Sequence, residues 1–224
     1  MLINLKELIK LYDLKINGIL HIGAHKLQEK PIYESIGLKA KDVIWVEADP
    51  KTVGECRMMY PQQNIHQEVM FSRDNEEKTF FIANDTQCSS LYDLKHHKNF
   101  NPGIKMTGKC TVKTKTVKTL FQENGYEAKK YNFFNLDTQG AEWDILAGCG
   151  SLLNNVDYIY AEVNTKEVYS GIHLVQDIDK LLESYGFKKA VESLYGWEGW
   201  GDALYIKNWK GSTKTTKPYA SLVQ

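Results

Sequence analysis

The chain has 224 residues, with 28 Lys and Arg residues against 28 Asp and Glu residues, so its formal net charge is zero. This length can bury one core without disulfide or metal support, and the balanced charge argues against a large nucleic-acid or membrane surface as the partner. Because the sequence has no apolar run of 18 residues, no signal-peptide pattern and no C-x-x-C pair, we expect one cytoplasmic domain with reduced cysteines.

Apolar spacing predicts a helix at residues 2–13, after which strand patterns alternate with helical patterns. This alternation predicts an α/β domain built from βαβ units, with a mostly parallel sheet and helices on both faces. The last two strands flank a Gly- and Trp-rich segment at 196–201 and predict a C-terminal hairpin. The seven predicted strands of the sheet are 16–22, 43–47, 64–70, 131–136, 158–163, 187–193 and 203–207. The predicted helices between them are 28–36, 50–60, 117–123, 141–146 and 174–185.

The middle of the chain interrupts the alternation of strands and helices. Two further strands are predicted at 78–83 and 109–117, and the polar, turn-rich segment 84–108 between them is predicted to be an insertion. A long irregular insertion in a compact domain is usually either functional or disordered. We place the domain at residues 1–207 and expect a flexible tail at 208–224, where Ser, Thr and Lys dominate.

The most informative segment begins where an apolar run ends at Asp137 and a helical pattern follows. In an open α/β sheet, ligands bind at the carboxyl ends of the strands, so Asp137, Gln139 and Glu142 are predicted at the site. Glu162 ends the next strand and is expected beside Asp137, which makes these carboxylates candidates for removing a proton from a substrate. The alternative for Glu142 is an acid that is favoured at a helix start by the dipole.

Two earlier strand ends suggest a nucleotide site. The turn His21–His25 follows the first strand, but its single glycine is one of three that a dinucleotide fingerprint needs, so a purely structural turn fits equally well. Glu47 ends the second strand about two dozen residues later, where a carboxylate can accept hydrogen bonds from ribose hydroxyl groups. A solvated Glu at a strand end is the alternative reading.

These motifs together resemble the FkbM-like family of S-adenosylmethionine-dependent methyltransferases. The resemblance rests on Asp-Thr-Gln-Gly-Ala-Glu at 137–142, on His-Ile-Gly-Ala-His at 21–25, and on the Glu, Tyr and Gly of 162–171. Many relatives have Asp where His21 stands, and Leu27 occupies the place of the second glycine of the loop. The resemblance implies a Rossmann-like methyltransferase fold over roughly residues 18–207, with a seven-stranded, mostly parallel sheet, and S-adenosylmethionine as the cofactor.

The resemblance also implies roles for individual residues. The implied cofactor-binding residues are His21, Gly23, Ala24, His25, Glu47, Ala48, Ser90 and Asp137. The implied catalytic residues are Asp137, Glu142 and Glu162. Asn164 and Tyr169 are candidates for binding a polyhydroxylated acceptor. Residues 95–118 contain seven Lys and no Asp or Glu, so Lys113 and Lys115, on one face of a predicted strand, could bind the phosphates of an acceptor or form a solvated surface.

We therefore expect a methyltransferase that acts on a hydroxyl group of a sugar, a nucleotide-sugar or another small metabolite, with no nucleic-acid or membrane partner. The carboxylate spacing demands no metal ion. A nucleic-acid methyltransferase is the alternative within the class, although the Asn/Asp-Pro-Pro-aromatic motif of amino-group methylation is absent. A non-catalytic cofactor-binding module on the same fold is the alternative outside it. The missing glycines disfavour a nicotinamide-dependent oxidoreductase.

Overall fold

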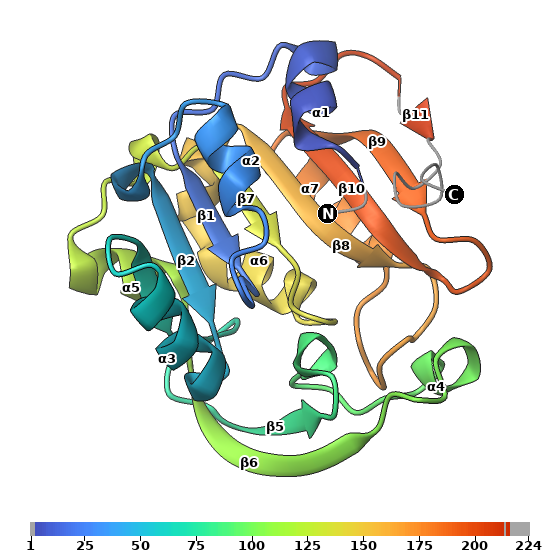
Figure 1. Ribbon diagram of the computed structural model, residues 1–224. Coiled ribbons are helices and arrows are strands. Elements are labelled where there is room, and N and C mark those ends of the chain that lie inside the picture. Colours follow the sequence, from blue (N-terminus) through green and yellow to red (C-terminus); the bar gives the residue numbers. More distant parts are fainter. Residues whose placement is uncertain (1–2, 213, 216–224) are drawn as a thin grey trace.

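The computed structural model describes residues 3–212 and 214–215. A central sheet lies between two layers of helices (Figure 1), with the strand order β11-β9-β10-β8-β7-β1-β2-β3. β10 is antiparallel to both of its neighbours, and the other pairs are parallel. The strands of this sheet are β1 (Ile19–Ile22), β2 (Val43–Glu47), β3 (Asn64–Gln67), β7 (Phe133–Leu136), β8 (Tyr158–Asn164), β9 (Phe187–Leu194), β10 (Trp200–Lys207) and β11 (Lys214–Thr215).

All seven strands predicted for the sheet are present, and the hairpin closes it as expected. The two-residue strand β11 adds an eighth by pairing with β9. Strand β11 lies within the segment that is predicted to be a flexible tail. Residue 213 and residues 216–224 of that segment lie outside the described residues. The Rossmann-like prediction is therefore confirmed by the strand order.

Helices cover both faces of the sheet because its strands are buried on both sides. One face packs its apolar side chains against α1, α2 and α3, and the other against α5, α6 and α7. Within the described residues, no helix combines the length and the apolar character needed to cross a bilayer. The helices are α1 (Leu5–Tyr12), α2 (Lys30–Ser35), α3 (Pro50–Met59), α4 (His97–Phe100), α5 (Val117–Asn124), α6 (Glu142–Cys149) and α7 (Val175–Glu183). Short 3-10 turns are η1 (Ala40–Asp42), η2 (Thr86–Cys88), η3 (Ala128–Lys130) and η4 (Gly150–Asn155).

A second, three-stranded sheet lies across the carboxyl ends of the central strands (Figure 1). It consists of β4 (Val69–Met70), β6 (Met106–Lys115) and β5 (Glu77–Ala83), in that order. The strand predicted at 64–70 is divided between the two sheets, because the chain leaves β3 and pairs with β6 instead. The strand predicted at 109–117 ends at Lys115, since the Thr116 side chain accepts a hydrogen bond from the Thr119 amide and so caps α5.

The predicted insertion packs against the domain through two isolated strand bridges. Ser90 pairs with Phe81, and Leu94 pairs with Tyr169 of the loop after β8. A small apolar cluster around Leu94, Ile104 and Tyr169 holds this segment in place. The insertion is therefore brought to the edge of the sheet where the candidate site residues lie.

Candidate active site

Carboxylates lie in a row across the carboxyl ends of the central strands. The parallel register pairs Ile22 with Leu136 and Leu136 with Ala161, so the next residues, Gly23, Asp137 and Glu162, are neighbours. Glu162 is also directly opposite Asp202 of the antiparallel strand β10. Three acids therefore face one edge of the sheet from three adjacent strands. Asp202 is a site residue that the sequence analysis did not identify, because its position depends on the antiparallel pairing.

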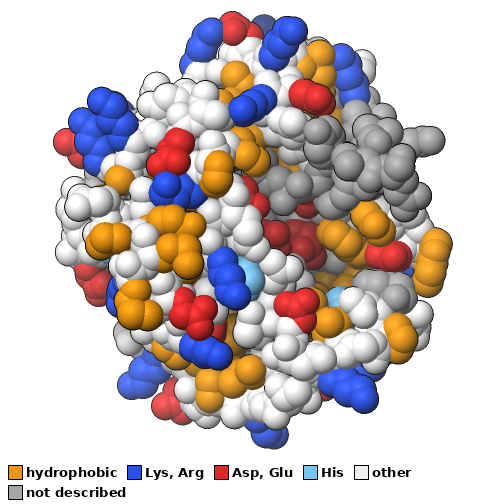
Figure 2. Space-filling model, in the orientation of Figure 1, with side chains coloured by type: hydrophobic (Ala, Val, Ile, Leu, Met, Phe, Trp, Pro, Cys, Tyr) orange, Lys and Arg blue, Asp and Glu red, His pale blue; other side chains and the backbone are white. Residues whose placement is uncertain are grey.

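A cavity of about 670 Å³ opens along this edge. Figure 2 shows acidic side chains at the floor of a hollow in this face. Of the residues that the structure describes, no Lys or Arg lines the cavity. The eight acidic residues that line it are Glu29, Glu47, Glu68, Asp85, Asp137, Glu162, Glu198 and Asp202.

Gly23 lets the loop after β1 pass closely between its neighbouring strands. Its φ is +80°, and a Cβ at this position would lie 1.7 Å from the carbonyl oxygen of Asp137, so no other residue fits without a backbone shift. The amides of Gly23 and Ala24 both donate to the carbonyl oxygen of Val46, at 2.9 and 3.0 Å. The loop is thereby fixed between β2 and β7. Ala24 itself is buried in the apolar core on one face of the sheet.

Glu47 is held by backbone donors on both of its oxygens. The His25 amide donates to Oε2 at 2.7 Å, and the Asp49 amide donates to Oε1 at 2.9 Å. Burial raises the pKa of Glu47, and these N–H donors act against that rise. A carboxylate has about four lone-pair sites, so Glu47 can still accept a further donor. Two neighbouring hydroxyl groups of a ribose fit this arrangement, and Ala48 lines the cavity beside it.

The loop that begins at Gly23 also contacts the insertion. Nε2 of His25 lies 2.9 Å from Oγ1 of Thr86, so the ring joins the β1 loop to η2. The φ of Leu27 is +57°, in the left-handed region that glycine occupies without strain. A glycine would adopt this turn without strain. Leu27 is 1% exposed, so here its side chain contributes to the core instead.

His21 lines the cavity but is held within the core. Its ring lies 5.2 Å from the Trp45 ring, and Nδ1 is 3.1 Å from the hydroxyl oxygen of Tyr33. Asn135 donates to the same hydroxyl oxygen at 2.8 Å. Burial lowers the pKa of His21, so the ring is neutral near pH 7. This neutral, hydrogen-bonded histidine supports the floor of the cavity.

Glu142 lies behind the loop after β7 and is not among the described residues that line the cavity. Its Oε1 accepts from the amide and the hydroxyl of Thr138, at 2.7 and 2.9 Å, and its Oε2 accepts from the Gly140 amide at 3.0 Å. Burial raises the pKa of Glu142 to about 7, against the lowering by these donors. Glu142, which is predicted to be catalytic, thus holds the loop after β7 in its conformation through these hydrogen bonds.

Gln139 bridges the two carboxylates that line the cavity at the ends of β7 and β8. Its Nε2 lies 2.8 Å from Oδ1 of Asp137 and 2.8 Å from Oε2 of Glu162. Burial raises the pKa of Glu162 well above its usual value, and the nearby charges of Asp137 and Glu142 raise it further. The motif predicts Gln139 at this edge, but nothing in the sequence indicates the bridge.

Side chains from two distant segments fix Gln139 in turn. The hydroxyl of Tyr169 donates to Oε1 of Gln139 at 2.6 Å, and Ser90 donates to the Gln139 carbonyl oxygen at 2.7 Å. Tyr169 lines the cavity, whereas Ser90 is buried behind it. Asn164 is 2% exposed and lies opposite Trp200, and among the described residues no donor reaches its Oδ1.

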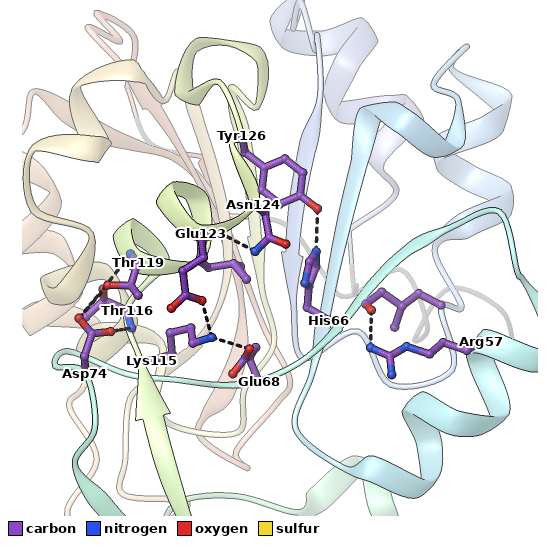
Figure 3. A network of polar contacts seen from close by, with 12 residues as sticks. Arg57, His66, Glu68, Asp74, Lys115, Thr116, Thr119, Glu123, Asn124 and Tyr126 are labelled. Atoms are coloured by element: carbon purple, nitrogen blue, oxygen red, sulfur yellow. Dashed lines mark hydrogen bonds and ion pairs between the residues drawn. The ribbon is translucent and has the colours of Figure 1, made fainter.

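Lys113 and Lys115 lie away from the cavity. Figure 3 shows Lys115 between two acids, with Nζ 2.6 Å from Oε1 of Glu68 and 2.7 Å from Oε2 of Glu123. Lys113 is exposed on β6, opposite Glu77. The two side chains share a strand face, as expected, but the face belongs to the second sheet. No described group of three or more His, Cys, Asp or Glu side chains has the geometry of a metal site.

The hairpin between β9 and β10 supplies a wall of the cavity that the sequence analysis did not identify. Tyr195, Glu198 and Trp200 all line it. The Gly- and Trp-rich composition of the turn was the only available signal, and it indicates a turn rather than a ligand.

Comparison with known proteins identifies related chains. Residues 21–189 match the family model of the methyltransferase FkbM domain. The 2-O-methyltransferase NoeI of Sinorhizobium fredii (strain NBRC 101917 / NGR234) is 26% identical over 189 residues, which are 80% of this chain and 76% of that protein. The structure of magnesium protoporphyrin IX methyltransferase (ChlM) from Synechocystis PCC 6803 with bound SAM is 13% identical, with a TM-score of 0.48 over 90% of this chain and 75% of that chain. For S. pombe Dnmt2 methyltransferase the identity is 10% and the TM-score 0.46, over 89% of this chain and 52% of that chain.

Proposed function

Since the chain belongs to the FkbM family of methyltransferases, with S-adenosylmethionine as the cofactor, we propose that it methylates a hydroxyl group of a neutral sugar. The observation that carries this proposal is the lining of the cavity, in which the described residues combine acids and aromatic rings without Lys or Arg. A relative that is itself a 2-O-methyltransferase supports oxygen as the methyl acceptor.

The residues around Gly23 and Glu47 fit the cofactor. The carboxylate of Glu47 would accept the ribose hydroxyl groups, and Gly23 lines the cavity beside the strand ends. Negative charge on the row of acids would complement a positive charge on the cofactor. When bound, S-adenosylmethionine supplies an activated methyl group, so this chain's side chains have only to position the acceptor and remove a proton.

Glu162 is the residue that we assign to proton removal, with Asp137 beside it to orient the acceptor hydroxyl. The shared amide of Gln139 fixes both carboxylates relative to each other. A raised pKa makes Glu162 a stronger base once it has lost its proton, which suits it to accept a proton from a hydroxyl. Glu162 is 6% exposed, so its own contact with water is limited.

The same lining favours a neutral acceptor over a phosphorylated one. Phosphate groups bind to Arg and Lys side chains or to clusters of backbone amides, and like charges at a binding site disfavour the ligand. Among the described residues, eight acids and no Lys or Arg line the cavity wall. Lys115, which could otherwise receive a phosphate, is paired with Glu68 and Glu123. Nucleotide-sugars and sugar phosphates are therefore the disfavoured acceptors.

The proposal is tested with S-adenosylmethionine that carries a deuterated methyl group. The protein is incubated with neutral methyl pyranosides, the matching sugar phosphates and nucleotide-sugars, and the products are identified by mass spectrometry. We expect a deuterated methyl ether on a neutral pyranoside. Transfer only to phosphorylated sugars, or to nitrogen or carbon, would overturn the proposal. Cofactor binding without transfer to any acceptor would favour a non-catalytic module.

A further inference from the structure

The β9–β10 hairpin places two aromatic rings on the cavity wall. The rings of Tyr195 and Trp200 are stacked, with centroids 5.1 Å apart and planes at 13°. Both side chains are half-buried, and both line the cavity, so part of their surface remains available to a ligand. Nε1 of Trp200 donates to Oε2 of Glu198 at 2.8 Å, which fixes the indole against rotation.

The hairpin turn is fixed to the loop after β8. The Thr165 amide donates to the carbonyl oxygen of Gly199 at 2.8 Å, and Nζ of Lys166 donates to the carbonyl oxygen of Trp197 at 3.0 Å. Gly199 has a φ of +87°, and a Cβ there would lie 2.9 Å from Cδ of Lys166. The aromatic wall is thus held in place before any ligand binds, which reduces the ordering that binding requires.

Hydrogen-bonding groups surround this wall. Asp202 lies two residues beyond Trp200 on the same face of β10, directly opposite Glu162, and both acids line the cavity. Asn164 and Ser193 are the cross-strand partners of Trp200 and Asp202, respectively. Oδ1 of Asn164 and Oγ of Ser193 are buried with no hydrogen-bond partner among the described residues. Buried polar groups are usually paired, so a bound group or an ordered water is expected beside them.

Aromatic rings next to carboxylates match the chemistry of one class of ligand. A pyranose ring has an apolar face of C–H groups that can pack on an aromatic ring, and its edge carries hydroxyl donors that carboxylates accept. A phosphorylated ligand would meet Glu198, Asp202 and Glu162 with the wrong charge. A purely apolar ligand would offer these three acids no further hydrogen-bond donor.

We infer that the β9–β10 hairpin forms the acceptor subsite, in which a neutral pyranose ring packs on Trp200 and Tyr195 while its hydroxyl groups donate to Glu198 and Asp202. This inference rests on the proposed function, because it names the residues that select the sugar. Trp200 is then a specificity-determining residue for the acceptor, and it should have no part in binding the cofactor.

The test measures sugar binding without requiring turnover. Saturation-transfer NMR and titration of a panel of neutral methyl pyranosides are carried out on the full chain in the presence of S-adenosylhomocysteine. Trp200→Leu should weaken sugar binding about tenfold, the size expected for losing a stacked ring. Trp200→Phe should recover most of the affinity. Trp197→Leu is the matched control, because Trp197 is on the same turn and is 68% exposed, and it should leave sugar binding unchanged.

Calorimetry with S-adenosylhomocysteine shows whether each variant is folded, and its dissociation constant should stay within about twofold of wild type. If Trp200→Leu fails this check, Tyr195→Leu replaces it. Unchanged sugar affinity in folded Trp200→Leu or Tyr195→Leu, or no pyranoside bound by the wild type, would overturn the inference. Sugar binding that depends on Trp200 without any methyl transfer would instead overturn only the proposed function.

Discussion

The two halves of the cavity treat their buried acids differently. In the half formed by the loops after β1 and β2, both oxygens of Glu47 accept hydrogen bonds from backbone amides, whose positions are fixed by the fold. In the half formed by β7, β8 and β10, Glu162 shares one side-chain amide with Asp137 and lies opposite another acid, Asp202. The backbone donors oppose the rise in the pKa of Glu47 that burial causes, whereas the neighbouring acids raise the pKa of Glu162 further. On the proposed function, the first half binds the cofactor and the second removes a proton from the acceptor.

The largest effect should come from the second half. Glu162→Gln should lower kcat about 100-fold or more, because a positioned base typically contributes that much and an amide cannot accept the proton. The dissociation constant of S-adenosylhomocysteine should change by less than about threefold, since the lost interaction matters mainly in the transition state. Steady-state kinetics and calorimetry on the same preparation measure both quantities.

Glu68→Gln is the matched control for that substitution, because Glu68 also lines the cavity but is paired with Lys115. It should retain near wild-type kcat. If Glu162→Gln lowers affinity as much as turnover, Glu162 is a binding residue, and the distinction between the halves fails.

The next effect should come from the first half. Glu47→Ala should weaken the binding of S-adenosylhomocysteine by about 1 to 3 kcal/mol, as expected when two hydrogen bonds to a charged group are lost. At saturating cofactor, kcat should remain within about threefold of wild type, because Glu47 does not contact the reacting atoms.

Calorimetry compares this variant with Glu34→Ala, whose carboxylate is exposed at the end of α2. Wild-type affinity in Glu47→Ala would show that the two backbone amides, rather than a ribose, are the only partners of this acid.

The smallest effect should come from outside both halves. Replacing Lys113 and Lys115 together with Gln should leave the KM for the acceptor unchanged, because neither side chain lines the cavity. The free energy of unfolding should fall by no more than about 1 kcal/mol, since the Lys115 ion pairs are partly exposed. Kinetics at two ionic strengths and urea denaturation measure these effects. A large rise in the acceptor KM would instead support the binding of acceptor phosphates by Lys113 and Lys115.

The sequence predicts the first half well because its residues are local. The glycine loop and Glu47 each follow directly from a strand end, and their spacing follows from one βαβ unit. The alternation of strands and helices predicts the βαβ units, and the family resemblance adds the seven-stranded fold, whereas the order of the strands comes from the structure.

The second half depends on contacts between distant segments. Gln139 reaches Glu162 only because β7 and β8 pair in one register, and it is held by Tyr169 and Ser90 from two other loops. Asp202 faces the site through antiparallel pairing, which a sequence pattern does not specify. The lysine-rich strand is present, but it belongs to the second sheet, and neither Lys113 nor Lys115 lines the cavity.

The most direct test asks whether the acids at the ends of β7 and β8 face the positive charge of the cofactor. S-adenosylmethionine carries one more positive charge than S-adenosylhomocysteine. Burial and the charges of Asp137 and Glu142 raise the pKa of Glu162, so Glu162 is neutral below that pKa and negative above it. Calorimetry should therefore show that the preference for S-adenosylmethionine over S-adenosylhomocysteine increases about fivefold to tenfold as the pH rises through the raised pKa of Glu162. In Glu162→Gln the preference should stay nearly constant over the same change in pH. A preference that is independent of pH in the wild type, or that rises equally in the variant, would contradict the assignment of this charge to Glu162.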